Sequence, residues 1–181
     1  MTSVLKVDNI QNSSGTSALS IDSNGNVASN NHYIGIYKNG NQAGTNQTWT
    51  KITGWTVEGN GGLTWDSTDN EIDVAKAGSY FVNFQAQIFS SSNDIGQVWL
   101  KVYKNGSHLF GSYNMAMNGA NTANPFDPRH WTCNVSNVVK LAENDSLSFY
   151  FYATATTPTI FDGDATGGER ATNVSMMRLG D

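Results

Sequence analysis

Charged residues are scarce in this sequence. Only 14% of its 181 residues are Asp, Glu, Lys or Arg, and the formal net charge is −5. Nucleic acids and anionic membranes attract proteins through clustered lysines and arginines, and this sequence contains no basic run. We therefore expect neither nucleic acid nor an anionic membrane as a partner.

Cysteine and long apolar runs are also missing. The single cysteine, Cys133, cannot form an internal disulfide, and its alternating apolar surroundings predict a small buried side chain. No stretch approaches the roughly 18 consecutive apolar residues of a membrane-spanning helix. Residues 1–6 lack the charged and apolar regions of a secretory signal. We expect no membrane insertion and no export by such a signal.

Glycine and short polar residues make up much of what is present. The chain has 18 glycines and many Asn, Ser and Thr residues, whereas stretches rich in Ala, Glu, Lys and Leu are nearly absent. This balance is typical of a turn-rich β protein. A chain of this length suits one packed domain with a short extra segment.

The longest alternating pattern covers residues 79–89 and predicts a strand. Its even-numbered side chains are apolar and would face the core: Tyr80, Val82, Phe84, Ala86 and Ile88. A hairpin is predicted downstream, with strands at 97–104 and 107–110 around the turn Asn105-Gly106. Further strands are predicted at 129–141, 146–154 and 170–179, and shorter ones at 33–37, 48–52, 63–65 and 71–74.

Three ordered motifs resemble the globular head of the C1q/TNF-like family. They read AGSYFV at 77–82, WLKVYKNG at 99–106 and VVKLAENDSL at 138–147. The resemblance covers residues 32–181. It implies an all-β fold, a ten-stranded jelly-roll β-sandwich, and assembly into compact homotrimers.

The first 31 residues differ from this head. Burying about five apolar side chains yields on the order of 10 kcal/mol, whereas ordering thirty residues costs several times more at about 1–2 kcal/mol each. The segment must therefore contact the sandwich, neighbouring copies or a larger assembly. Its sequences LKVDNIQN at 5–12 and ALSIDSNGNV at 18–27 resemble N-terminal segments of bacteriophage fibre and other virion proteins.

Together the two resemblances imply a subunit of a phage appendage. Residues 1–31 would form a short extended attachment and oligomerisation segment, and residues 32–181 an exposed head. The protein would be a homotrimeric capsid or tail fibre or decoration subunit, assembled in the host cytoplasm and located on the virion with other virion proteins. Host adsorption is the expected role of the head. The side chains expected to dock on the particle are Leu5, Val7, Ile10, Leu19 and Ile21.

No catalytic constellation is visible, so we expect a non-enzyme. The three histidines, His32, His108 and His130, fall in separate predicted strands or strand edges without carboxylates or a cysteine spaced to complete a site. No serine lies in a Gly-x-Ser-x-Gly turn. A polysaccharide depolymerase would need a paired acid and base that the sequence does not place.

One acidic, glycine-rich stretch invites comparison with a calcium loop. Asp162, Asp164 and Glu169 are the candidate ligands. The stretch departs from the full pattern, because Thr166 stands at the fifth position and Asn173 at the twelfth. We expect a solvated turn and no cofactor.

The aromatic residues leave an alternative function open. Five tryptophans and seven tyrosines could stack on sugar rings, which would suit a free lectin-like carbohydrate-binding module. We favour core and subunit-interface roles for them. The loop at 114–128 is the better candidate for contacting a host receptor or surface glycan, because loops on rigid scaffolds carry recognition.

The second side of the long strand has a property of its own. No charged residue occurs between positions 79 and 93, although a strand that faces water usually carries charge. We predict that this side packs against a neighbouring subunit. The predicted interface residues are Phe81, Asn83, Gln85, Gln87 and Phe89.

Overall fold

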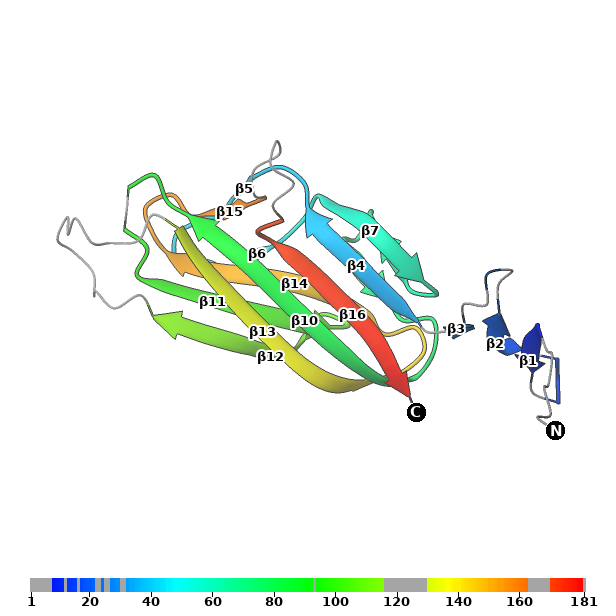
Figure 1. The fold of residues 1–181 in the computed structure, drawn as a ribbon. Coiled ribbons are helices and arrows are strands. Elements are labelled where there is room, and N and C mark those ends of the chain that lie inside the picture. The colour runs from blue at the N-terminus through cyan, green and yellow to red at the C-terminus, as the bar shows by residue number, and fades with distance from the viewer. Residues whose placement is uncertain are drawn as a thin grey trace.

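A computed structural model describes residues 8–11, 13–15, 17–21, 24, 27–29, 32–92, 94–115, 130–162 and 170–180. In these residues the fold is all-β, with two antiparallel sheets packed as a sandwich and a small third sheet (Figure 1). No helix in this part of the chain is long and apolar enough to cross a membrane.

The first sheet of the sandwich has seven strands. Its order is β5-β15-β10-β16-β4-β7. β15 and β16 pair with different stretches along one edge of β10, and β13 pairs with the whole length of the other edge. The strands are β4 (Tyr33–Lys38), β5 (Gln42–Ala43), β7 (Trp55–Gly61), β10 (Gly78–Phe89), β13 (His130–Leu141), β15 (Thr159–Phe161) and β16 (Asn173–Gly180). Because β13 pairs with β10 over twelve residues, these two strands form the longest ladder of the sheet.

The second sheet has six strands in the order β12-β11-β14-β9-β8, with β6 pairing on β14. The strands are β6 (Thr50–Lys51), β8 (Thr64–Asp66), β9 (Glu71–Asp73), β11 (Gln97–Lys104), β12 (Ser107–Met115) and β14 (Ser146–Thr154). In Figure 1, β11, β12 and β14 lie behind the layer formed by β13, β10, β16 and β4.

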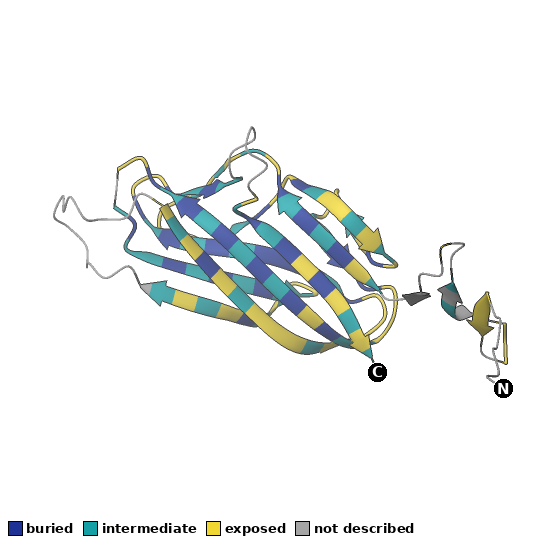
Figure 2. Cartoon of the chain, viewed as in Figure 1, coloured by how far each residue is buried: buried dark blue, intermediate teal, exposed yellow. Residues whose placement is uncertain are grey.

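The hydrophobic core fills the space between the two sheets. The even-numbered side chains of β10 from Tyr80 to Ile88 are all 0% exposed, which confirms the predicted core side. Phe84 on β10 meets Phe149 on β14 with ring centroids 5.2 Å apart, and Trp55 contacts both rings. Figure 2 shows buried residues alternating with residues of intermediate exposure along most of β10.

The turns at one end tie the two sheets together. Asn105 and Gly106 both adopt positive φ, as the predicted hairpin requires. The Asn105 side chain donates to Asp145 Oδ1 at 2.7 Å and accepts the Ser146 N–H at 2.8 Å. Asp145 Oδ2 accepts the Ala142 N–H at 2.7 Å. The two Asn105 bonds therefore join the β11–β12 turn to the β13–β14 turn, and the Asp145–Ala142 bond closes the latter.

Most predicted strands of the head occur, and two keep their predicted bounds. These are 97–104 and 146–154. The return strand predicted at 107–110 continues to Met115, because its whole length pairs with β11. The strand predicted at 48–52 shrinks to β6, since only two residues there pair with β14.

Three strands of the head were not predicted: β5, β7 and β15. Ser148 lies on the outward side of β14 but is 2% exposed, and it is one of the groups that hydrogen-bond the carboxylate of Glu71 on β9. A neighbouring strand thus covers this position.

The N-terminal segment forms the third sheet, with β1 (Asn9–Gln11), β2 (Ser17–Ile21) and β3 (Val27–Ser29) in sequence order. In Figure 1 it lies beyond the end of the sandwich where β16 ends. Of the predicted docking side chains, Ile10 is 49% exposed, and Leu19 and Ile21 are partly exposed. Leu5 and Val7 lie outside the described residues.

Candidate functional site

The outward side of the first sheet carries a row of exposed apolar side chains. Strand register places Val138 opposite Phe81, Phe81 opposite Met177, and Met177 opposite Tyr33. These four residues, here called the apolar row, are 55%, 37%, 44% and 47% exposed respectively. Side chains opposite one another on neighbouring strands make contact. The row is therefore a continuous hydrophobic band across β13, β10, β16 and β4.

The middle of the same face is polar but uncharged. Asn134 Nδ2 donates to Asn83 Oδ1 at 2.8 Å, and Gln87 Nε2 donates to Thr132 Oγ1 at 3.2 Å. Gln85 Nε2 donates to the Ala171 carbonyl at 3.3 Å. These bonds hold the amide side chains against the sheet, which makes the surface flat.

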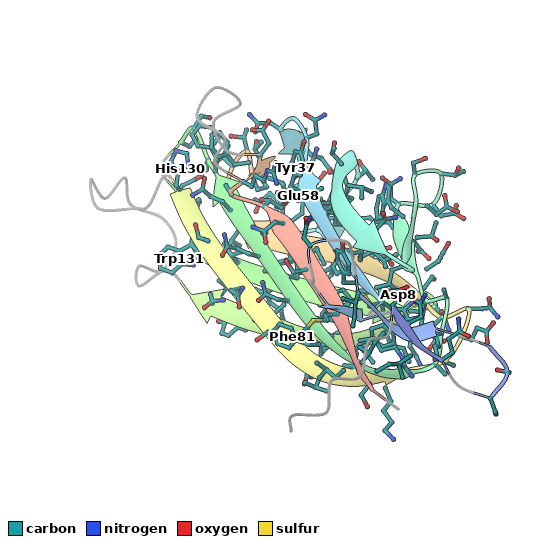
Figure 3. All side chains as sticks on the ribbon, turned by 45° about the vertical axis from the view of Figure 1, so that its right-hand side comes forward. Asp8, Tyr37, Glu58, Phe81, His130 and Trp131 are labelled. Carbon is teal, nitrogen blue, oxygen red and sulfur yellow. The ribbon has the colours of Figure 1, made fainter. Side chains whose placement is uncertain are left out.

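Aromatic rings close the far end of this face. His130 lies 4.9 Å from Phe89 and 5.4 Å from Phe161, measured between ring centroids. In Figure 3, Phe81 and His130 mark the two ends of the face. The five predicted interface residues on β10 thus run from the apolar row to this aromatic cluster.

We call this surface the charge-free face. It consists of His130, Thr132, Asn134, Ser136 and Val138 on β13, Phe81, Asn83, Gln85, Gln87 and Phe89 on β10, Asn173, Ser175 and Met177 on β16, and Tyr33, Gly35 and Tyr37 on β4. Charge occurs only at its margins. Lys140 follows on β13. Arg170 forms an ion pair with Glu58, and its guanidinium lies 4.2 Å from the Tyr37 ring. Figure 3 labels Glu58 and Tyr37.

A hollow of 360 Å³ opens in the charge-free face beside Arg170 and Glu58. Gly35 lines it, and a Cβ built on Gly35 would meet no atom within 4 Å. Gly59 on β7 pairs directly with Gly35, and Ser175 pairs on its other side. Small residues on three adjacent strands therefore create this depression between Tyr33 and Tyr37.

The outward side of the second sheet is built differently. It carries a group of six aromatic residues, here called the aromatic face: Trp49, Trp99, Tyr103, Tyr113, Tyr150 and Tyr152. Trp99 lies at the centre of one cluster, with Tyr113 at 4.7 Å, Tyr152 at 5.6 Å and Trp49 at 6.1 Å. Lys101 Nζ lies 4.1 Å from the Trp49 ring centroid.

The aromatic face holds polar atoms that the described structure does not pair. Trp99 Nε1 and Thr154 Oγ1 are buried and have no hydrogen-bond partner. Thr154 shares the outward side of β14 with Tyr152, opposite Gln97 on β11. Buried polar groups are normally paired, so such atoms call for a physical explanation.

The predicted roles of the tryptophans divide between core and surface. Trp55 is buried in the core, and Trp65 and Trp131 pack against it as expected. Trp49 and Trp99 instead belong to the aromatic face. Sequence alternation placed Trp99 away from the core but did not reveal its cluster, because Trp49 and Tyr152 come from distant strands.

The three histidines remain apart. His32 Nδ1 lies 3.0 Å from the Gly62 carbonyl, His108 contacts Tyr103, and His130 contacts Phe89. The described residues contain no group of three or more His, Cys, Asp or Glu side chains that could hold a metal ion. Burial raises the pKa of the Cys133 thiol to about 12, so it stays protonated near neutral pH.

The calcium candidate is only partly described. Asp164 and Glu169 lie outside the described residues. The Asp162 N–H donates to Asn41 Oδ1 at 3.1 Å. Lys38 Nζ donates to the Asn39 carbonyl at 2.9 Å. Burial lowers the pKa of Lys38, and the negative charge of Asp162 opposes that shift. Of the loop predicted at 114–128 to contact a receptor, only Asn114 and Met115 are described.

Another carboxylate has a structural task that the sequence did not reveal. Asp94 accepts hydrogen bonds from Ser90 Oγ and from the N–H and hydroxyl of Thr156. Burial alone would raise its pKa, but these bonds outweigh burial and hold the pKa below its usual value. Asp94 thereby links the β10–β11 connection to the segment after β14.

Comparison with known proteins supports the fold. No family model matches the sequence, and no curated protein does. An Eiger TNF from S. frugiperda is similar in structure, with a TM-score of 0.59 and 13% identity over 83% of this chain and 94% of that one. Murine APRIL at pH 5.0 gives a TM-score of 0.56 and 13% identity over 82% and 99%. The chain thus has the predicted TNF-like jelly-roll fold.

Proposed function

We propose that this protein is a structural subunit of a phage virion, a homotrimeric capsid or tail fibre or decoration protein. Residues 1–31 dock on the particle, and the jelly-roll head faces outward and serves host adsorption. Its partners are other copies of itself and other virion proteins. In this proposal the subunit has no catalytic role and needs no cofactor.

The charge-free face is the observation that supports self-association. It presents four exposed apolar side chains in register, followed by a flat, uncharged surface, and its charges lie at the margins. The centres of protein interfaces are depleted in charged residues, and the rims around them are polar. The resemblance to the C1q/TNF-like family supports three copies as the number that assembles.

The N-terminal sheet supports the docking role. Figure 1 places β1, β2 and β3 beyond the sandwich, and Ile10 is half exposed there. An apolar side chain in such a small sheet gains stability when another surface covers it. The resemblance of this segment to phage fibre N-termini supports a virion protein as that surface.

A matched pair of glutamines tests the assembly. Gln85 and Gln97 are both half-buried and lie on the outward sides of different sheets. We expect the wild-type protein to sediment as a trimer. Gln85→Lys should dissociate, because each subunit would bury an unpaired ammonium group in the interface. Gln97→Lys, the control, should stay trimeric. A monomeric wild type, or a trimeric Gln85→Lys variant of unchanged stability, would overturn the proposed interface.

Substitution of Ile10 tests the docking role separately. Ile10→Asp places a charge on the N-terminal sheet and leaves the head unchanged. We expect trimers of normal stability that no longer enter particles when supplied during assembly. Normal incorporation of this variant would contradict a docking role for Ile10.

The alternative function is a free lectin-like module, and the aromatic face favours it. Such a module would bind carbohydrate without a particle. The two functions are distinguished by whether the protein occurs in purified virions.

A further inference from the structure

We infer that the aromatic face on the outward side of β11, β12 and β14 is a binding site for neutral, β-linked hexopyranose chains. This inference rests on the proposed adsorption role, for which such a chain on the host surface would be the ligand. The site lies within one subunit, so saccharide binding does not depend on the trimer.

The arrangement of the side chains matches a sugar chain. All-equatorial pyranose rings present apolar C–H faces above and below and hydroxyl groups around the edge. Aromatic side chains with polar tips offer the same combination. Here Tyr113 is 49% exposed, the Lys101 ammonium group lies over the Trp49 ring, and the phenol groups of the tyrosines supply hydroxyl partners.

The spacing favours an oligosaccharide over a single sugar. Trp99 and Tyr103 lie on the same side of β11, four residues and therefore about 13 Å apart. Trp99 anchors one aromatic cluster, and Tyr103 contacts Tyr150 at 4.5 Å in a second. Lys101 stands between the two clusters. A chain of several pyranose units would span both.

A second copy of the protein fits this face poorly. Of the described large hydrophobic side chains that are exposed, Tyr113 is the one on the aromatic face, whereas the apolar row contributes four. Its other five aromatic residues are half-buried, and the three tyrosines among them end in hydroxyl groups. A protein interface of this kind would leave many hydroxyl groups to be paired.

Charge favours a neutral ligand. The chain carries a net charge of −5. Four carboxylates, those of Asp66, Asp69, Glu71 and Asp73, lie in or between β8 and β9, and β9 is the strand beside β14. Lys51 forms an ion pair with Glu71. Lys101 lies over the Trp49 ring, and in the described structure no carboxylate is within ion-pair distance of its ammonium group. One ammonium group suits hydrogen bonding to hydroxyls better than attraction of a polyanion.

Calorimetric titration with three defined saccharides tests the inference. We expect saturable binding of cellohexaose, weaker binding of cellobiose, and weaker binding of a galacturonate hexamer than of cellohexaose. Absence of saturable cellohexaose binding would overturn the site. Equal or tighter binding of the galacturonate hexamer would overturn its neutral character.

Two tyrosines of similar exposure provide the matched control. Tyr113 on the aromatic face is 49% exposed and Tyr33 on the charge-free face is 47% exposed. Tyr113→Ala should weaken cellohexaose binding about tenfold, whereas Tyr33→Ala should leave it unchanged. Lys101→Gln should weaken binding and Lys140→Gln should not. Unchanged binding by a folded Tyr113→Ala variant would contradict the inference, whatever the oligomeric state.

Discussion

The two outer faces of the sandwich rest on one shared core but present different chemistry. The charge-free face joins a band of exposed apolar side chains to a flat surface of amides and hydroxyls. On the aromatic face, half-buried rings pack against one another in T-shaped and tilted pairs, and the face carries phenol hydroxyl groups and the ammonium group of Lys101. The first surface is suited to another flat protein surface, and the second to a ligand that offers C–H faces and hydroxyls.

The difference shows why alternation alone does not assign function. Both β10 and β11 turn one side inward and one outward, and both lie inside their sheets. Outward on β10 lie a serine, two phenylalanines and three amides, whereas outward on β11 lie Gln97, Trp99, Lys101 and Tyr103. The alternation is the same in both strands, so the faces differ in these residue types and in the neighbours that strand register adds to them.

The largest expected effect compares the two sides of β10. Phe84→Ala removes a fully buried ring that contacts Trp55 and Phe149, so unfolding in urea should show a loss of about 3–5 kcal/mol. Phe81→Ala removes a ring that is 37% exposed and should cost the isolated subunit about 1 kcal/mol or less. Equal losses would mean that the outward side belongs to the folding core.

The next effect concerns the turns that hold both faces in place. Asp145→Asn weakens the bonds from Ala142 and Asn105 and the ion pair with Lys104 at 3.3 Å. The subunit should lose about 1–3 kcal/mol at neutral pH. The neighbouring, exposed Glu143 provides the control, because Glu143→Gln should change stability little.

The contribution of Asp145 should also depend on pH. Burial alone would raise its pKa, but the donors around it hold the pKa below the usual value. A depressed pKa adds stability above the unfolded value of about 3.9 and loses it as the pH falls through the folded pKa. The gap between wild type and Asp145→Asn in urea unfolding should therefore shrink only below about pH 4. A gap that already shrinks between pH 7 and pH 5 would contradict this cause.

A smaller effect separates the faces by their role in assembly. Tyr33→Ala removes one end of the apolar row and should weaken trimer association by about tenfold or more in sedimentation equilibrium. Tyr113→Ala removes a ring of similar exposure on the other face and should leave association unchanged. If both variants weakened association equally, the distinction between the faces would fail.

The smallest effect is a lack of reaction. Cys133 lies on the inward side of β13, is 2% exposed, and has a pKa raised to about 12 by burial. A thiol-reactive dye at pH 8 should not modify the native protein but should label it fully in denaturant. Rapid labelling of the native protein would show that β13 detaches from β10 in solution.

Much of the head could be predicted because its strands carry local signals. Strong alternation and the Asn105-Gly106 turn fixed β11 and β14 to the residue. β7 was missed because its residues Trp55–Gly61 include two glycines and show no regular alternation, and only pairing with β4 holds them extended. β15 was missed because its three residues are too few to show an alternating pattern. Pairing with β10 and β5 holds them extended.

The candidate surfaces were predictable only in part. The absence of charge on β10 can be read from consecutive residues, so the interface prediction includes Phe81 and Gln85. Val138, Met177 and Tyr33 could not be added, because they join the row only through pairing between strands far apart in the chain. Val138 and Met177 lie opposite Phe81, and Tyr33 lies opposite Met177. The cluster around Trp99 depends on tertiary structure in the same way.

The hollow at Gly35 has a practical consequence when combined with the inert thiol of Cys133. A cysteine placed at Gly35 would have room for its side chain and would be the sole thiol to react with a dye in the folded protein. The attached fluorophore would lie inside the charge-free face. Its brightness and anisotropy would therefore report, in real time and without separation of species, when that face is covered and when it is released.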